Sequence, residues 1–344
     1  MKPSVFALSL LALASGSCTT PPAPAGNTAA ESPPAGSPVA LHGELRTNGN
    51  RVVNADGNTV SLAGVSFFWS TTGWGQDDLY NAAAVDYFAD DWDASLVRAA
   101  IAADRNGGYV SDPEGNLARA HAVIDAAIDK GLYVIADWHS HHAEDNPEAA
   151  VEFFTGLAEK YGDTPNIIYE IYNEPLDTAD WSTVVKPYSK QLIDAIREVD
   201  PDNLILVGTQ SWSQDVDKAA ADPILGETNI AYTLHFYAAS HKQDLRDKAQ
   251  AALEAGLPLF VSEWGGVNYD GDGGVDKASV MQWMAFMRAN GISHANWAVS
   301  DKKEGASIFK PGTSPAGPFT DEDLTESGAF VKSIVAGWDE TPTE

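Results

Sequence analysis

Two glutamates, each at the end of a strand-like apolar run, are the residues of this sequence best suited to acid–base chemistry. Glu174 closes the run at residues 167–172, and Glu263 closes the run at 259–262. In a parallel barrel the carboxyl ends of all strands open on one face, so residues far apart in the chain can meet there. We therefore expect the two carboxyl groups to share one site.

Other side chains that could bind or react also stand at predicted strand ends. Each of them alone has an ordinary explanation in packing or ion pairing, but a core has no need for acids, imidazoles, amides and rings at one mouth. The set comprises Arg98, His139, Asn173, Gln210, Trp212, His235, Tyr237 and Trp297.

Two carboxyl groups at one mouth suit the hydrolysis of a glycosidic bond. One protonates the leaving oxygen, while the other attacks the anomeric carbon or activates water. Close carboxylates cannot both ionise cheaply, so one pKa must rise and the other must fall. A separation of about 5–5.5 Å would indicate retention of configuration and about 6.5–9.5 Å inversion, which the sequence leaves open.

The neighbours of each glutamate indicate its role. Arg98 and Tyr237 can stabilise ionised Glu263 by charge and hydrogen bonding, which favours Glu263 as the nucleophile. Glu174 is then the acid/base. Its neighbour Asn173 can donate to a sugar 2-hydroxyl, and His235 can tune its proton.

Seven motifs at these strand ends together resemble glycoside hydrolase family 5, in its bacterial endoglucanase branch. The resemblance covers most of residues 41–340. In chain order the motifs are Val97-Arg98-Ala99-Ala100, Asp137-Trp138-His139, Asn173-Glu174-Pro175, Trp212-Ser213-Gln214-Asp215-Val216-Asp217, His235-Phe236-Tyr237, Ser262-Glu263-Trp264-Gly265 and Asn296-Trp297-Ala298-Val299-Ser300-Asp301-Lys302.

The resemblance implies a retaining endo-β-1,4-glucanase (a cellulase) that works by double displacement without metal or other cofactor. It assigns the acid/base role to Glu174 and the nucleophile role to Glu263. It implies supporting roles for Arg98, His139, Asn173, His235, Tyr237 and Trp297. It further implies that Trp212 forms a platform on the leaving-group side and that Lys302 and Glu304 bind a sugar on the other side.

Two departures from the family pattern concern sugar contacts. Trp69 can supply the ring expected after the first strand, but the usual histidine beside it is absent, and Ala102 stands where a sugar-contacting tyrosine is common. Mannan, xyloglucan or mixed-linkage glucan therefore remain alternative substrates. A non-catalytic carbohydrate-binding barrel is a further alternative, although a pure binder gains nothing from two crowded carboxyl groups.

Two segments imitate metal sites. The histidines at 139, 141 and 142 lie on a single loop without a thiolate, and His139 already has a sugar-binding role by the resemblance. Residues 270–274 imitate the start of a calcium loop, but Met281 stands where the closing glutamate belongs. We predict no metal at either.

Strand-like and helix-like segments must alternate to position these residues, and they do so from residue 60 onward. They predict a (β/α)8 TIM barrel preceded by a short β-hairpin at 44–53. The predicted strands are 60–68, 94–101, 132–137, 167–172, 204–208, 230–236, 259–262 and 293–299. The predicted helices are 84–92, 116–129, 147–161, 181–199, 243–255, 277–289 and 328–338.

The first residues have the pattern of an export signal. An uncharged run at 5–13 leads to small residues and then to Cys18, at a lipobox-like position, so we expect residues 1–18 to be a signal peptide and Cys18 to be lipidated. Ordinary cleavage and secretion are the alternative. The Pro-, Ala-, Ser- and Thr-rich residues 19–40 form a linker, and 41–344 form the catalytic domain. The protein is thus expected at the cell surface, as an outer-membrane lipoprotein, or outside the cell.

Charge and composition limit the partners. The 344-residue chain carries a net charge of −28, which disfavours nucleic acids and anionic membranes and favours a neutral partner such as a β-glucan polysaccharide. Its one cysteine excludes an internal disulfide. No segment is long and apolar enough for a transmembrane helix, and we expect a monomer.

Overall fold

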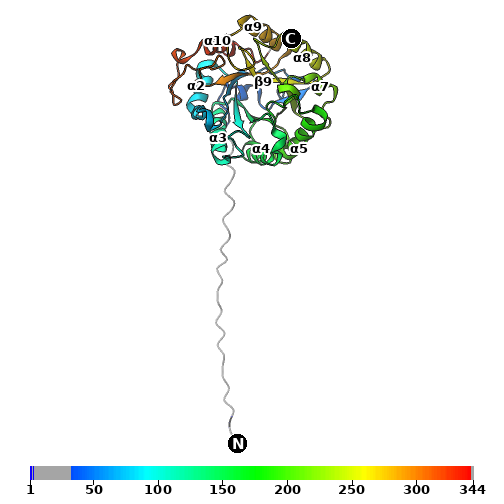
Figure 1. The fold of residues 1–344 in the computed structure, drawn as a ribbon. Coiled ribbons are helices and arrows are strands. Elements are labelled where there is room, and N and C mark those ends of the chain that lie inside the picture. Colours follow the sequence, from blue (N-terminus) through cyan, green and yellow to red (C-terminus); the bar gives the residue numbers. More distant parts are fainter. Residues whose placement is uncertain (2, 4–31, 342–344) are drawn as a thin grey trace. The chain divides into compact units, whose positions relative to one another are not determined.

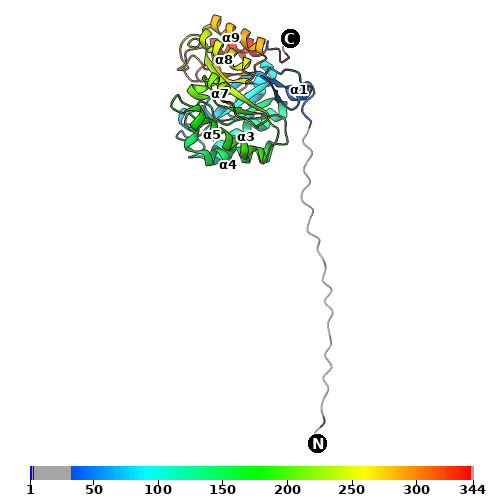
Figure 2. The same ribbon diagram turned by 90° about the vertical axis from the view of Figure 1, so that its right-hand side faces the viewer.

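Eight parallel strands close into a barrel in the computed structural model, which describes residues 1, 3 and 32–341. Each strand pairs with its neighbours in chain order, and the last pairs with the first (Figures 1 and 2). The predicted TIM barrel is confirmed. The strands are β3 (Ala63–Phe67), β4 (Leu96–Ala102), β5 (Tyr133–His139), β6 (Ile167–Glu170), β7 (Ile205–Val207), β8 (Ile230–Tyr237), β9 (Leu259–Gly265) and β10 (His294–Val299).

Helices in the connections between strands surround the barrel (Figure 1). The α-helices are α2 (Ala82–Trp92), α3 (Pro113–Lys130), α4 (Pro147–Tyr161), α5 (Lys186–Arg197), α7 (Val216–Ala221), α8 (Gln243–Glu254), α9 (Lys277–Asn290) and α10 (Glu326–Val335). The segment labelled α6 (Gln210–Ser213) is a short turn with left-handed backbone at Ser211 and Trp212. The short helices are η1 (Thr72–Trp74), η2 (Asp77–Leu79), η3 (Ala143–Asp145) and η5 (Asp321–Asp323), and η4 (Trp181–Val185) is a π-helix. The helix predicted over 181–199 is therefore η4 followed by α5, and α6 and α7 were not predicted.

Local sequence explains where the helices begin and end. The Asp112 side chain accepts a hydrogen bond from the Gly115 backbone at the start of α3, and Pro113 occupies the first turn, where its missing N–H costs nothing. Gly131 ends the same helix with φ 67°, in the left-handed region that a residue without Cβ adopts readily. The predicted boundaries of this helix were therefore close to the observed ones.

The N-terminal hairpin is confirmed as β1 (Arg46–Asn48) and β2 (Arg51–Val53), but the structured chain begins before residue 41. Helix α1 (Pro38–His42) occupies the end of the predicted linker because Val39 is buried and its N–H donates to the carbonyl of Gly131. Cys18 and the predicted signal peptide, apart from residues 1 and 3, lie outside the described residues. Within those residues, no helix has the length and apolar content to cross a membrane.

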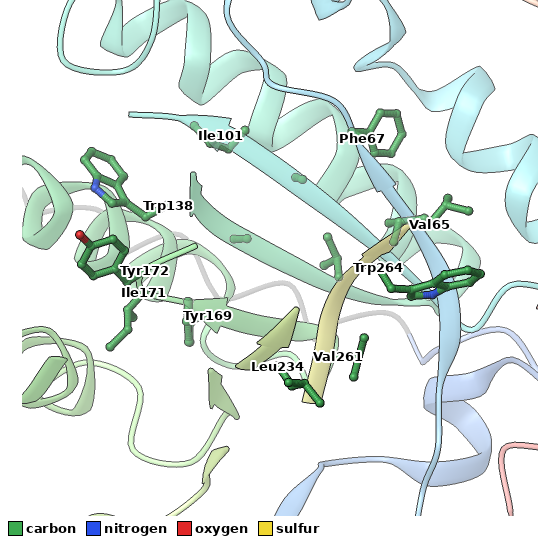
Figure 3. Packing of buried hydrophobic residues seen from close by; sticks show 14 of the residues in the cluster. Val65, Phe67, Ile101, Trp138, Tyr169, Ile171, Tyr172, Leu234, Val261 and Trp264 are labelled. Atoms are coloured by element: carbon green, nitrogen blue, oxygen red, sulfur yellow. The ribbon is translucent and has the colours of Figure 1, made fainter. Parts of the chain in front are cut away.

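A large apolar cluster fills the space between the barrel and its helices. Figure 3 shows Val65, Phe67, Trp138, Tyr169 and Trp264 from this cluster, all of them buried. Side chains on the other face of the strands point into the barrel, so the strands are covered on both sides, as in other parallel sheets. The barrel is thus a rigid frame for the residues at its mouth.

His294 of β10 is a buried neutral imidazole, which makes the fold sensitive to acid. Burial lowers its pKa to about 3, and its Nδ1 accepts a hydrogen bond from Trp264 Nε1 at 3.1 Å. Between pH 6.5 and 3 the unfolded chain therefore binds a proton that the folded chain rejects, so stability falls as the pH falls through this window.

We predict that this group alone removes about 2–3 kcal/mol of unfolding free energy between pH 7 and 4.5. Denaturant unfolding at both pH values should show a smaller acid-induced loss in His294→Asn, which keeps an acceptor for Trp264 but does not titrate. An equal loss in both proteins would contradict the assignment.

Candidate active site

Side chains that point into the barrel form layers, and the middle layer is charged. Alternate residues of a strand face the same side, so Leu96, Arg98 and Ala100 all point inward from β4. Ile168 and Glu170 do the same on β6. A lower apolar layer therefore supports a layer of ionisable groups, which lies directly beneath the mouth.

Arg98 is fully buried at the centre of the charged layer. Its Nε and Nη2 donate to the two carboxylate oxygens of Glu170 at 2.7 and 3.2 Å, Nη2 lies 2.9 Å from Asp137, and Nη1 lies 3.2 Å from Glu263. Burial opposes the charge of Arg98, but the three carboxylates raise its pKa above the ordinary value. Glu170 was not predicted as a site residue, although its position two residues after Ile168 places it on the inward face.

An irregularity in β9 directs Glu263 into the site. The register between β8 and β9 shifts just before Glu263, and as a result both Ser262 and Glu263 reach groups inside the barrel. Glu263 accepts hydrogen bonds from the Tyr237 hydroxyl at 2.8 Å and from Arg98, as predicted. Gly265 permits this arrangement, because a Cβ there would lie 2.3 Å from the Tyr237 ring.

Glu174 follows β6, and the rings of two histidines contact its carboxylate. His235 Nδ1 lies 3.1 Å from one of its oxygens, and His141 Nε2 lies 3.2 Å from the other. His235 was predicted in this position, whereas His141 was not assigned to it. Asn173 accepts from Arg98 through Oδ1, and its buried Nδ2 has no protein partner among the described residues, so it is free to donate to a ligand.

The pKa order of the two glutamates is the reverse of the expected one. Burial and then the charge of Glu174 raise the pKa of Glu263. Burial disfavours ionised Glu174 too, but hydrogen bonds from His141 and His235 outweigh it and lower the pKa of Glu174 to about 2. The reason is that both imidazoles converge on Glu174, which the sequence could not show.

The proton that Glu174 lacks is held by His235. Burial disfavours the His235 imidazolium, yet its contacts with Glu170 and Glu174 raise its pKa to about 9. Ser262 Oγ donates to Glu170 at 2.7 Å, so it accepts from His235 Nε2 at 2.9 Å and fixes a proton on that nitrogen. One further proton is then shared between His235 Nδ1 and Glu174.

The distance between the two glutamates is short. One oxygen of Glu174 and one oxygen of Glu263 lie within 4.8 Å of each other. This approach favours the closely spaced carboxyl pair of a retaining glycosidase over the wider pair that holds a water in an inverting enzyme.

The same groups are the described residues whose geometry could hold a metal. Single ligand atoms of Glu174, His235 and Glu263 converge within 4.8 Å. Both ring nitrogens of His235 are already engaged, one by Glu174 and the other by Ser262, so a metal would have to break one of these contacts. These contacts fit an acid/base glutamate that is hydrogen-bonded to His235 better than a set of metal ligands.

A cavity of about 280 Å³ adjoins the two glutamates on the Glu263 side. It contains the predicted sugar-binding residues Trp69, His139, Trp297, Lys302 and Glu304. The ring of Trp297 stacks on that of His139 at 5.1 Å between centroids, and Lys302 pairs with Glu304 at 2.7 Å.

Two exposed rings of this cavity, Trp74 and Tyr269, were not predicted. Trp69 is only 7% exposed, because the rings of Trp74 and His139 and the guanidinium of Arg105 pack against it, whereas Trp74 is 43% exposed. Trp74 belongs to η1 in the connection after β3, where no pattern of the sequence distinguishes it from a packing residue.

A second cavity, of about 430 Å³, adjoins Glu174 but does not include Glu263. It contains Trp212, which is 40% exposed and lies within a run of three residues with positive φ, from Ser211 to Ser213. Ser213 Oγ donates to the carbonyl of Asn173 and thereby ties the backbone beside Trp212 to the segment that carries Glu174. Gln210, which was predicted at the mouth, does not line this cavity. Its side-chain oxygen instead accepts a hydrogen bond from the Trp181 N–H.

Comparison with known proteins agrees with this geometry. Residues 53–303 match the family described as Cellulase (glycosyl hydrolase family 5). The chain belongs to this family. It is 52% identical over 294 residues to endoglucanase Z of Dickeya dadantii, covering 86% of this chain and 66% of that protein, so it spans slightly less than two thirds of this relative's length.

Solved structures with the same fold support the family 5 membership. A structure from Cytophaga hutchinsonii has a TM-score of 0.84 at 45% identity and covers 87% of this chain and 96% of that chain. The catalytic domain of Thermobifida fusca endoglucanase Cel5A, in a Gln variant bound to cellotetraose, has a TM-score of 0.82 at 33% identity, with coverages of 87% and 99%.

The shared proton of this family 5 site predicts an alkaline limit of activity. Because the pKa of His235 is raised to about 9, the proton is present below pH 9 and is lost above it, so kcat/KM should fall in that range. In Ser262→Ala, His235 loses a hydrogen-bond acceptor. We predict that the alkaline limb of the pH profile, where kcat/KM falls, then moves about one pH unit lower. Rates on a soluble β-glucan across pH 5–10 measure the shift.

Ser66→Ala provides the matched control. Ser66 is also a buried serine, but it contacts Arg98 and not His235. It should leave the alkaline limb in place. A limb that does not move in Ser262→Ala, or moves equally in both variants, would contradict the role of Ser262.

Proposed function

We propose that this protein is a retaining endo-β-1,4-glucanase. One observation supports this most directly: an oxygen of Glu174 lies within 4.8 Å of an oxygen of Glu263, in a cleft with cavities on both sides. The relatives support the substrate class, since one is named endoglucanase Z and a second binds cellotetraose. Space on both sides of the glutamates supports cleavage within a chain rather than at its end.

In the first step, Glu263 attacks the anomeric carbon while Glu174 protonates the leaving oxygen. Glu174 is ionised in the free protein, so it must first take the proton from His235. A sugar in the cleft removes the remaining contact of Glu174 with water, which disfavours its ionised form and moves the proton across the 3.1 Å contact. The free Nδ2 of Asn173 can donate to the sugar 2-hydroxyl.

In the second step, Glu174 accepts a proton from water, which attacks the ester and releases Glu263. The ester carries no charge, so Glu263 no longer forms an ion pair with Arg98. Glu263 also no longer repels the negative charge of Glu174. Both changes keep Glu174 ionised while it acts as the base. The same residue thus serves both steps, because the charge of its neighbour differs between them.

Substitution of each glutamate by glutamine tests the mechanism. Glu263→Gln should lose at least about a thousandfold in kcat, and Glu174→Gln about 10²–10⁴-fold on polysaccharide. An aryl glycoside with a good leaving group needs no acid, so Glu174→Gln should form the glycosyl-enzyme from it at close to the wild-type rate. Assays on carboxymethylcellulose, barley glucan, mannan and xylan, with NMR of the first-formed anomer, provide the measurement.

The outcomes separate mechanism from substrate. Equal activity of all three proteins would exclude the acid pair, and an inverted first product would exclude the covalent step. A preference for mannan or xylan would overturn the substrate alone. Loss of hydrolysis in every protein, with retained binding, would favour the non-catalytic carbohydrate-binding barrel.

We also infer that the protein is exported and lipidated at Cys18, as the signal-like residues 1–18 and the linker composition of 19–31 support. Labelling of expressing cells with a radioactive fatty acid should mark the wild type and not Cys18→Ser. The variant should appear in the medium rather than in the membrane fraction. Equal labelling, or equal release, would contradict the anchor.

A further inference from the structure

The two cavities can be assigned to the two sides of the scissile bond. Glu263 bonds to the retained sugar, and the cavity that includes it therefore holds the glycone. The cavity that includes Glu174 without Glu263 lies on the side of the leaving oxygen. This assignment rests on the proposed function.

Tyr269 lies where these two sides meet. It lines both cavities, as do Glu174, His141 and Tyr237, but unlike them it is 74% exposed. Within residues 32–341 its ring forms no aromatic pair and its hydroxyl no hydrogen bond, since the described contacts of this residue are those of its backbone. A large ring held in water at a cleft is available for a ligand.

The loop that carries Tyr269 is fixed at its base. It connects β9 to α9, and the Tyr269 N–H donates to Ser240 Oγ at 3.0 Å. Asp272 Oδ1 accepts hydrogen bonds from the N–H of its neighbour Gly273 and from the N–H of Gly305, which lies in the connection after β10.

The contact between the two loops is also close. The Ala306 N–H donates to the carbonyl of Gly271 at 2.9 Å, and a Cβ on Gly305 would lie 2.1 Å from the Gly273 carbonyl oxygen. The carboxylate of Asp272 therefore ties this loop to the one that carries Lys302 and Glu304. Tyr269 is presented from a braced loop.

We propose that Tyr269 is a substrate-binding residue that, together with Trp212, holds the sugar on the leaving-group side of the scissile bond. Trp212 and Tyr269 line the same 430 Å³ cavity from two different connections, the one after β7 and the one after β9. The apolar face of a β-linked glucosyl unit can pack on one ring while the second ring limits its rotation. The bound unit then presents its glycosidic oxygen to Glu174.

A trapped glycosyl-enzyme separates this site from the glycone side. A 2-deoxy-2-fluoro-β-cellobiosyl fluoride glycosylates Glu263 and releases fluoride, so trapping requires no sugar on the leaving-group side. Added cellobiose then reactivates the enzyme. Its 4-hydroxyl oxygen bonds to the anomeric carbon, the ester bond to Glu263 breaks, and Glu174 takes the hydroxyl proton.

We expect Tyr269→Ala to be trapped within about twofold of the wild-type rate. It should need about tenfold more cellobiose for half-maximal reactivation, because the apolar ring area that the sugar would cover is lost. Tyr269→Phe keeps the ring and should need at most about threefold more. Trp212→Ala should resemble Tyr269→Ala. Met281→Ala, at an exposed residue of α9 outside both cavities, should match the wild type.

Thermal melts show whether each variant is folded. An unchanged cellobiose requirement in Tyr269→Ala would overturn the proposal, as would a Phe variant that behaves like the Ala variant. An equal loss in trapping would also overturn it, because Tyr269 would then act on the glycone side. A wild type that is not trapped at all would instead remove the proposed function.

Discussion

The burial of one guanidinium among carboxylates is the constraint on which the rest of this site depends. Arg98 lies in the barrel interior with Asp137, Glu170 and Glu263 around it, and a buried charge without partners would cost several kcal/mol, in the range of about 3–5 when one partner of a pair is removed. Arg98 and its three partners lie on four different strands, so the ion cluster is complete only when the barrel is closed. Folding and preparation of the nucleophile are therefore the same event.

The His235 imidazolium shares with Arg98 the balance of charge in this cluster, whereas burial lowers the pKa of His139 and leaves that ring neutral. Two carboxylates of the layer, Glu170 and Asp137, each also contact a histidine, at 3.5 Å to His235 and 2.6 Å to His139. Glu170 stabilises the imidazolium of His235, which in turn keeps Glu174 ionised. The deeply buried carboxylate of Glu170 thus acts on the acid/base through one intermediate, His235, and the proton remains one hydrogen bond away from the atom that uses it.

The sequence predicted the architecture and the mouth residues well because both depend on simple periodicity. Strand-end positions, alternation with helices and the two glutamates follow from the order of residues. Other features depend on contacts between strands. The extra inward-facing residue of β9 and the convergence of His141 on Glu174 join segments that no local pattern relates.

Glu170 is an intermediate case, because alternation from Ile168 already places it inside the barrel. An acidic residue at an inward-facing position of a buried strand therefore predicts a charged layer inside the barrel. Trp74 and Tyr269 belong to the opposite case: they lie in connections, where an exposed ring and a packed ring have the same sequence pattern.

The different origins of these residues explain how one barrel can combine fixed chemistry with variable recognition. Arg98, Glu170 and Ser262 are held by the strands and are fully buried, so a change in any of them disturbs the proton and the nucleophile together. Trp74 and Tyr269 stand on connections and are 43% and 74% exposed. Substitution there leaves the charge balance intact, because neither ring contacts the ion cluster, and substrate preference can change without loss of the catalytic pair.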